Sequence, residues 1–218
     1  MCGLAGAFSA SDSQPLDRLT LLRMLAAISH RGPDGCGVFF EQSAALGSVR
    51  LAVEDVRNGR QPFVSNRGDV VCCYNGEISN HSALRAMLSK RGYVFRTDCD
   101  GEVIANLFAC GGRKALDDLE GQFAIALWDR RTRTATLARD EFGVLPLFFM
   151  ARPGRVVFAS SIAAFCQLPG LALTIDEHSL MEICTFWVPI GRSTFITEIR
   201  SVLPGETITV HEGEWRSA

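Results

Sequence analysis

The feature that most constrains this chain is a cysteine placed directly after the initiator methionine and directly before a buried-strand pattern. Cys2-Gly3 leads into residues 4–8 (LAGAF), a run of small and apolar residues that predicts a strand inside a sheet. Chain termini are normally loose, whereas a terminus that starts as a buried strand is tied down. We therefore expect the N-terminus to be held rigidly within a sheet.

Cys2 becomes chemically useful if Met1 is removed, because a terminal residue carries a thiol and an α-amine on one backbone unit. A thiol ordinarily has a pKa of ~8.5 and an α-amine one of ~7.7–8.0. An amine that accepts the thiol proton generates the thiolate, which is the better nucleophile. A plainer interpretation is that Cys2 is a small apolar residue at the start of a strand, since free cysteine is commonly buried. The position of Cys2 alone leaves both interpretations open.

Charge and composition narrow the range of partners. The 218-residue chain fits one domain, and its formal net charge of −2 leaves no basic stripe for nucleic acid. No apolar run reaches the ~20 residues that span a bilayer, and no secretion signal is visible. We therefore expect a cytoplasmic protein without membrane contact, whose 8 cysteines are reduced thiols. The scattered histidines form no ligand pattern, so we expect no metal.

Helix and strand patterns alternate along the chain. Helices are predicted over residues 16–28, 81–91, 103–110, 162–167 and 177–185. Strands are predicted over 37–40, 45–51, 69–74, 123–128, 134–138, 147–150, 156–160, 194–199 and 207–210. The strands from 123 to 160 resemble an antiparallel meander, and the last two a pair. Asn75-Gly76 predicts a hairpin turn, residues 30–35 a tight turn, and residues 96–102 a polar turn rich in carboxylates.

Several short motifs occur in an order that resembles one family. They are Cys2-Gly3, 30–35 (HRGPDG), 50–53 (RLAV), 74–78 (YNGEI), 100–104 (DGEVI), 118–124 (DLEGQFA), and 138–140 (ARD) through 146–148 (PLF). Together they look like the glutaminase domain of glutamine-hydrolysing asparagine synthetases. That domain is a class II glutamine amidotransferase of the N-terminal nucleophile hydrolase group. The tetrapeptide Arg-Gly-Pro-Asp resembles the asparagine synthetase branch in particular.

The resemblance implies an α+β fold with four layers, αββα, in which two stacked antiparallel sheets are flanked by helices. The strand-rich pattern is compatible with this fold but does not select it over other α+β architectures. The resemblance also implies a glutaminase domain over residues 2–210, followed by a tail at 211–218 that leads toward a synthetase domain. The implied reaction converts L-glutamine and water to L-glutamate and ammonia.

The family's catalytic roles fall on Cys2, Asn75 and Gly76. The Cys2 thiolate would attack the side-chain amide of glutamine, with its own α-amine carrying the proton, and a thioester would remain for water to hydrolyse. The side-chain amide of Asn75 and the backbone N–H of Gly76 would stabilise the oxyanion.

The family's substrate-binding roles fall on Arg50, Leu51, Val53, Glu77 and Asp100. Arg50 would bind the α-carboxylate of glutamine, a task that suits a planar guanidinium. Asp100 would bind the α-ammonium, with Asp98 as a less favoured alternative. The segment around Leu51 and Val53, together with Glu77, would complete the pocket, and residues 31–34 would support it as a turn.

The sequence departs from the family pattern at two places beside the pocket. Ser48-Val49 precedes Arg50 where family members often have histidine, and Glu54 stands where an aliphatic residue is usual. These departures concern details of the substrate pocket.

The family's ATP-binding loop, Ser-Gly-Gly-x-Asp-Ser, does not occur in the 218 residues. ATP and magnesium are therefore expected only in a partner or in a further synthetase domain, and no cofactor is expected in this chain. The apolar segment 186–205 is the expected docking face for that synthetase, and a homodimer is also considered.

Two other functions compete with this interpretation. One is a catalytically silent module that binds and regulates a synthetase. The other is an N-terminal nucleophile hydrolase that acts on a different amide. The joint presence of Cys2, Arg50, Asn75, Gly76 and Asp100 argues against both. The final acceptor of ammonia, aspartate or a specialised substrate, stays open.

Overall fold

Two six-stranded sheets form the centre of the computed structural model, which describes residues 1–11 and 13–217. Sheet A contains, in spatial order, β10 (Arg200–Ser201), β8 (Phe148–Arg152), β9 (Arg155–Ala159), β1 (Gly3–Ser9), β3 (Ala44–Arg50) and β2 (Gly35–Glu41). Sheet B contains β12 (Glu214–Ser217), β11 (Thr207–His211), β7 (Thr134–Arg139), β6 (Gly121–Asp129), β5 (Val70–Ile78) and β4 (Phe63–Val64). Neighbouring strands in both sheets run antiparallel.

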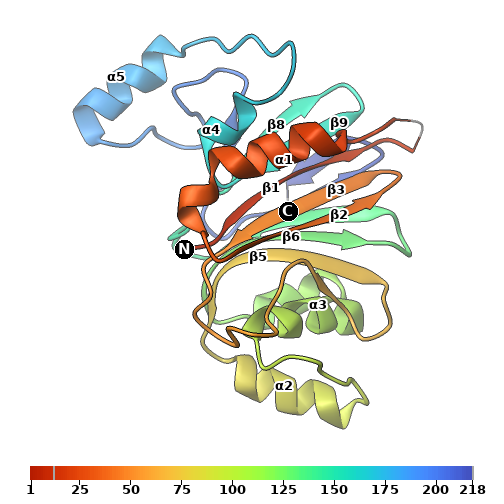
Figure 1. Cartoon of the computed structure of the whole chain (residues 1–218). Coiled ribbons are helices and arrows are strands. Elements are labelled where there is room, and N and C mark those ends of the chain that lie inside the picture. The colour runs from red at the N-terminus through yellow and green to blue at the C-terminus, as the bar shows by residue number, and fades with distance from the viewer. Residues whose placement is uncertain (12, 218) are drawn as a thin grey trace.

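Helices cover the outer face of each sheet (Figure 1). Sheet A carries α1 (Arg18–Ala27) and α4 (Ile162–Phe165), and sheet B carries α3 (Asp100–Gly111) with α2 (His81–Lys90) outside it. Short 3-10 helices occur at η1 (Ser29–Arg31) and η2 (Arg113–Asp118), and α5 (Glu177–Phe186) projects from the body of the molecule. The order of layers is therefore α, β, β, α, and the expected four-layer architecture is confirmed.

Strand β1 lies in the middle of sheet A, paired with β3 on one side and β9 on the other. All of its residues are buried, because both faces of the strand are covered. Leu4 and Phe8 belong to the core between the two sheets, whereas Ala5 and Ala7 belong to the core under α1. The prediction that the N-terminus is held inside a sheet is confirmed.

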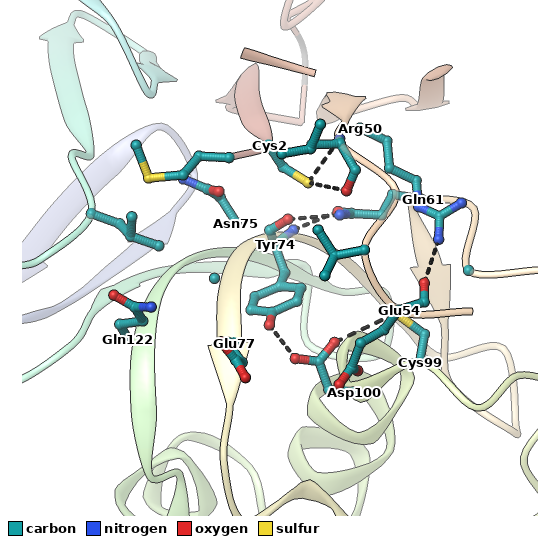
Figure 2. Close-up of a pocket in the computed structure, with 16 residues that line it drawn as sticks. Cys2, Arg50, Glu54, Gln61, Tyr74, Asn75, Glu77, Cys99, Asp100 and Gln122 are labelled. Atoms are coloured by element: carbon teal, nitrogen blue, oxygen red, sulfur yellow. Dashed lines mark hydrogen bonds between the residues drawn. The ribbon is translucent and has the colours of Figure 1, made fainter. Parts of the chain in front are cut away.

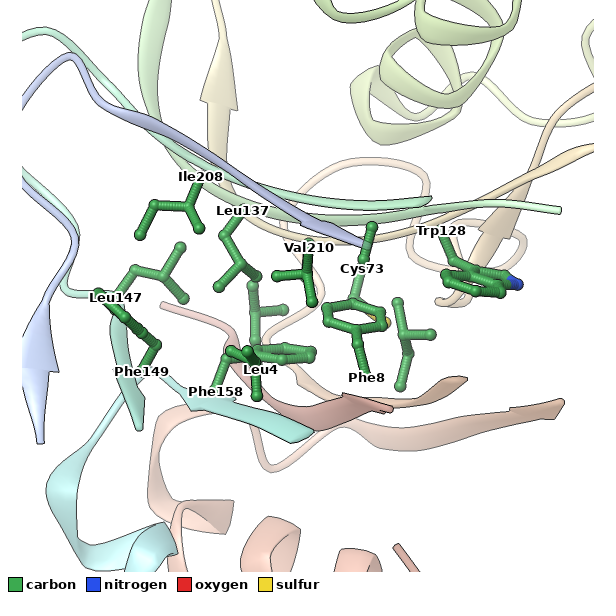
Figure 3. Packing of buried hydrophobic residues seen from close by; sticks show 14 of the residues in the cluster. Leu4, Phe8, Cys73, Trp128, Leu137, Leu147, Phe149, Phe158, Ile208 and Val210 are labelled. Atoms are coloured by element: carbon green, nitrogen blue, oxygen red, sulfur yellow. The ribbon is translucent and has the colours of Figure 1, made fainter. Parts of the chain in front are cut away.

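The core between the sheets is built from large side chains of both sheets (Figure 3). Phe8 stacks on Phe158 of sheet A with ring centroids 5.1 Å apart and on Trp128 of sheet B with centroids 6.0 Å apart. On β5, Cys73 points into this core and Cys72 into the core under α3. Burial raises the pKa of both thiols, so they stay protonated.

Asn75-Gly76 does not form the predicted hairpin turn. Both residues lie inside β5, where they pair with Ala124 and Phe123 of β6. The local turn preference is overridden because β6 offers a partner along the full length of β5. At Gly76, φ is 152°, and a Cβ atom would lie 2.1 Å from the backbone oxygen of Gln122. Only glycine fits there without a shift of the backbone.

The second half of the chain also differs from the prediction. The strands from 123 to 160 are not one meander, because β6 and β7 form a hairpin in sheet B while β8 and β9 form one in sheet A. Residues 194–199 form no strand; Ile196 makes only an isolated bridge to Ile175. Strand β11 pairs instead with β7 and β12.

Two segment boundaries need correction as well. Residues 214–217 of the expected tail form β12 at the edge of sheet B, and residue 218 lies outside the described residues. The polar turn expected at 96–102 ends earlier, because Asp100 already begins α3.

No helix in the described part of the chain is long and apolar enough to cross a bilayer.

Candidate active site

Every residue predicted for catalysis or substrate binding lines one cavity of about 250 Å³ (Figure 2). The lining comes from the residues before β1, the end of β3 with the loop after it, the second half of β5, the start of α3, the start of β6 and the loop after β7. The full set is Met1, Cys2, Arg50, Leu51, Val53, Glu54, Gly59, Gln61, Tyr74, Asn75, Gly76, Glu77, Cys99, Asp100, Gln122 and Leu145. The fold thus brings together residues from Met1 to Leu145, which are 144 positions apart in the chain.

Cys2 stands at the entrance to β1 and is held by contacts with its neighbours. The Leu51 N–H lies 3.4 Å from Cys2 Sγ, and Sγ lies 3.7 Å from the Leu51 carbonyl oxygen. The Cys2 carbonyl accepts a hydrogen bond of 3.1 Å from Arg31 Nε. Met1 also lines the cavity. Removal of Met1 would therefore leave the new α-amine beside the thiol, at the cavity.

The turn at residues 31–34 connects the nucleophile to the end of β3. Asp34 accepts a hydrogen bond of 2.8 Å from Ala52 N, and its own N–H donates to the Arg50 carbonyl at 2.9 Å. A Cβ at Gly32 would lie 2.5 Å from Arg50 N. Burial lowers the pKa of Arg31, whose guanidinium lies against the start of β1. These contacts match the supporting position that the sequence predicts for this turn.

Asn75 is buried in the cavity wall with an unused hydrogen-bond donor. The residue is only 1% exposed, and its Nδ2 atom is fully buried without a hydrogen-bond partner. An unpaired buried donor costs about 1–3 kcal/mol, so native proteins rarely keep one without a reason. The neighbouring Gly76 brings the backbone of β5 to the same wall. The site therefore holds a donor that is free to bind a ligand.

Arg50 is buried and already makes several hydrogen bonds. Its Nη1 donates to the Val56 carbonyl at 3.1 Å, and its Nη2 donates to the carbonyls of Glu54 at 2.7 Å and Asp55 at 2.9 Å. The guanidinium thus organises the loop that follows β3. Its remaining N–H groups are the ones available to a carboxylate in the cavity.

Asp100 is buried at the first turn of α3 and is also well supplied with donors. Its Oδ2 accepts from the Ile78 N–H at 3.0 Å and from the Tyr74 hydroxyl, and its Oδ1 accepts from the Cys99 thiol at 3.4 Å. Burial, followed by the charge of Asp100, raises the pKa of Tyr74, and burial raises the pKa of Cys99 to about 12. Both groups therefore remain protonated donors to the carboxylate.

Asp98, the alternative to Asp100, is exposed and does not line the cavity. Its N–H donates to Asp55 Oδ2 at 3.0 Å, so its role in the structure is to join two loops. The position of Asp100 in the cavity therefore favours Asp100 over Asp98 as the expected ligand of the α-ammonium.

Sequence reasoning did not assign a role to several residues of the cavity. Gln61 Nε2 donates to the Tyr74 carbonyl at 2.7 Å, and the Tyr74 N–H donates to Gln61 Oε1 at 2.7 Å. The Gln61 side chain thus makes the hydrogen bonds that a neighbouring strand would make with β5 at Tyr74. No local signal identifies Gln61. Tyr74 is part of the motif at residues 74–78, but the motif gave it no role. Glu54 stood out in the sequence only because the family usually has an aliphatic residue there. Within the described residues, no group of His, Cys, Asp and Glu side chains is arranged to hold a metal ion.

Comparison with known proteins places this geometry in a family. A family model described as a glutamine amidotransferase domain matches residues 1–218. Asparagine synthetase (glutamine-hydrolyzing) 1 of Bacillus subtilis is 32% identical over 212 residues, which cover 96% of this chain and 33% of that relative. Asparagine synthetase B of Escherichia coli is 37% identical over 165 residues, which cover 75% of this chain and 30% of that relative. The chain spans about a third of the length of these curated relatives.

Solved structures agree on the fold. Glutamine phosphoribosylpyrophosphate amidotransferase from Bacillus subtilis has a TM-score of 0.68 at 22% identity, covering 100% of this chain and 49% of that one. The allosteric regulatory enzyme of purine biosynthesis has a TM-score of 0.72 at 21% identity, covering 100% of this chain and 48% of that one. These likenesses confirm the fold of two antiparallel sheets flanked by helices. The chain therefore belongs to the glutamine amidotransferase domain family and is similar to the glutamine-hydrolysing part of asparagine synthetases.

Proposed function

We propose that this chain hydrolyses L-glutamine to L-glutamate and ammonia through a thioester on Cys2. The observation that carries the proposal is the buried, unpartnered Asn75 Nδ2 in the same cavity as the Cys2 thiol. A nucleophile and a free donor in one small cavity are the two parts that acyl transfer needs. The joint presence of Arg50 and Asp100 adds a site for an amino-acid head group.

The steps follow from these residues. After Met1 is removed, the α-amine of Cys2 takes the thiol proton, and Sγ attacks the side-chain amide carbon of glutamine. The negative charge that develops on the amide oxygen is stabilised by Asn75 Nδ2 and the Gly76 N–H. The C–N bond then breaks, the amine returns the proton to the departing ammonia, and water hydrolyses the thioester. No cofactor is needed for these steps.

The substrate's head group is held at the other end of the cavity. Arg50 binds the α-carboxylate with the N–H groups that the loop leaves free, and Asp100 binds the α-ammonium. Leu51, Val53 and Glu77 complete the walls. The spacing of the two ends selects a side chain that can reach from Asp100 to Cys2.

We further propose that the ammonia serves a synthetase domain or subunit that holds ATP and magnesium. An apolar surface supports this proposal: Met181 is 70% exposed and Trp187 90%, and Phe186, Val188 and Ile190 are also exposed. These residues lie on α5 and just after it, on the part that projects from the body (Figure 1). Exposed apolar patches usually mark contact sites. The occupant is the synthetase, because the relatives are about three times as long as this chain.

Other parts of the interpretation stay predictions. They are the cytoplasmic location and the homodimer, while the acceptor of the ammonia, aspartate or a specialised substrate, stays open. A catalytically silent module is less favoured, because the nucleophile and its expected partners share one cavity.

A glutaminase assay on purified protein tests the proposal. We expect release of glutamate and ammonia in equal amounts, and intact-mass analysis of the active protein is expected to show that Met1 is absent. Cys2→Ala should bind glutamine but release no ammonia, because only the nucleophile is lost. Turnover by Cys2→Ala, or full activity in protein that retains Met1, would contradict the proposed mechanism.

A further inference from the structure

One charged side chain in the cavity has no role in the site described above. Glu54 lies in the loop after β3, and its Oε2 atom is buried without a hydrogen-bond partner. None of the ion pairs found among the described residues includes Glu54. Its backbone carbonyl accepts from Arg50 Nη2 at 2.7 Å, which fixes the start of the side chain. A buried carboxylate oxygen without a partner is costly, and it is able to accept a hydrogen bond from a ligand.

The Glu54 side chain extends toward the end of the cavity where Asp100 lies (Figure 2). The charge of Glu54 acts on Tyr74: burial and Asp100 raise the pKa of Tyr74 most, and Glu54 raises it further. The Tyr74 hydroxyl donates a hydrogen bond to Asp100, so the carboxylates of Glu54 and Asp100 both lie near the Tyr74 phenol. Glu54 therefore adds a second acceptor at the head-group end.

Asp100 has little capacity left for a ligand. A carboxylate offers about four acceptor positions. The Tyr74 hydroxyl, the Ile78 N–H and the Cys99 thiol already occupy three of them. A substrate ammonium brings three N–H donors, which Asp100 cannot satisfy by itself.

The charges that line the cavity also favour a ligand with a positively charged group. Glu54, Glu77 and Asp100 bring carboxylates, whereas Arg50 is the cationic side chain in the lining. Three hydrogen bonds of the Arg50 guanidinium go to backbone carbonyls of its own loop. A ligand that carries a positive group beside Asp100 would relieve this excess of negative charge.

We infer that Glu54 is a specificity-determining residue that accepts a hydrogen bond from the substrate α-ammonium beside Asp100. The inference rests on the proposed glutaminase function and narrows its substrate class. The cavity would select free glutamine, with an unblocked α-amino group, over amides that lack this group. Glu54 would thus bind the ammonium directly through Oε2.

The test compares L-glutamine with glutaramate, which has the same chain and amide but no α-ammonium. In Glu54→Gln and Glu54→Leu, kcat/KM for glutamine should fall roughly tenfold to a hundredfold, the range expected for a lost hydrogen bond to a charged group. For glutaramate, kcat/KM should stay within about threefold, because this substrate never used the carboxylate. Glu54→Asp should recover part of the discrimination. Calorimetric binding of both molecules to Cys2→Ala protein measures the same preference without turnover.

A matched control separates recognition from loop structure. Asp55 lies next to Glu54, and its carboxylate accepts from the N–H groups of Asn58 at 3.2 Å and Asp98 at 3.0 Å. Asp55→Asn should loosen the loop and lower activity toward both substrates in the same proportion. If folded Glu54→Gln and Glu54→Leu proteins also leave the ratio of the two substrates unchanged, the inference is overturned. If wild-type protein does not hydrolyse glutamine at all, the proposed function itself fails.

Discussion

The two ends of the cavity differ in how completely their polar groups are satisfied. At the nucleophile end, the Asn75 amide has a buried donor without a partner, and Cys2 Sγ has only the long contacts of 3.4 and 3.7 Å to Leu51. At the head-group end, Arg50 and Asp100 each make three hydrogen bonds with the protein. Glu54 Oε2 is the exception at that end.

This difference matches what each end is proposed to do. A donor that stabilises a transition state should be free until charge develops, since interactions already satisfied in the ground state add nothing to the rate. A head group needs a rigid receptor, and the hydrogen bonds to Arg50 and Asp100 supply that rigidity before the substrate arrives. Substitutions at the two ends should therefore affect different kinetic constants.

Apart from loss of the nucleophile itself, the largest effect is expected at Asn75. Asn75→Ala should lower kcat by about 10²–10³, because it removes a donor for the oxyanion, and should change KM little. The thermal midpoint should hardly fall, since Nδ2 has no partner to lose. Steady-state kinetics combined with a melting curve measures both. A large loss of stability with normal kcat would show that Asn75 is a structural residue.

Substitution of Arg50 should instead change KM and stability. Arg50→Ala removes the α-carboxylate ligand and also three hydrogen bonds to the carbonyls of residues 54–56. We expect KM for glutamine to rise by roughly tenfold to a hundredfold, together with lower stability of the loop. Hydrogen exchange over residues 50–60 would report the loop directly. Unchanged exchange and unchanged KM would mean that the head-group end is not built around Arg50.

Asp100 and Asp98 provide a matched pair for the next prediction. Asp100→Asn should raise KM about tenfold, because a neutral amide binds the ammonium less well than the buried carboxylate does. Asp98→Asn should leave KM near the wild-type value, since Asp98 is exposed and lies outside the cavity lining. Glutamine titrations of the two variants decide between them. The reverse pattern would transfer the ammonium site to Asp98.

The smallest effect is expected from Tyr74→Phe, which removes one donor to Asp100 and leaves the Ile78 N–H in place. KM should rise only a few-fold, by about 1 kcal/mol of binding free energy, with kcat unchanged. A loss of kcat as large as that of Asn75→Ala would break the distinction between the two ends. Such a result would mean that Tyr74 positions Asn75 rather than Asp100.

Individual site residues could be identified from the sequence to a large extent. Cys2, Arg50, Asn75 and Asp100 stand in short motifs that keep their spacing, and all of them line one cavity. The buried run after Cys2 also predicted a rigid terminus correctly, because continuous apolar residues indicate a strand covered on both faces. The strand prediction depends on neighbouring residues only, whereas the site residues were assigned through the resemblance of these motifs to a family.

Other features depended on contacts between distant segments. Asn75-Gly76 has the composition of a turn, yet it is part of a strand because Phe123 and Ala124 pair with it. The hairpins β6–β7 and β8–β9 look alike in sequence, but packing places them in different sheets. Glu54 became a candidate ligand only when its surroundings showed no partner for Oε2. Local patterns determine periodicity and turn preference, whereas strand pairing and the satisfaction of buried charges are decided by residues that meet only after folding.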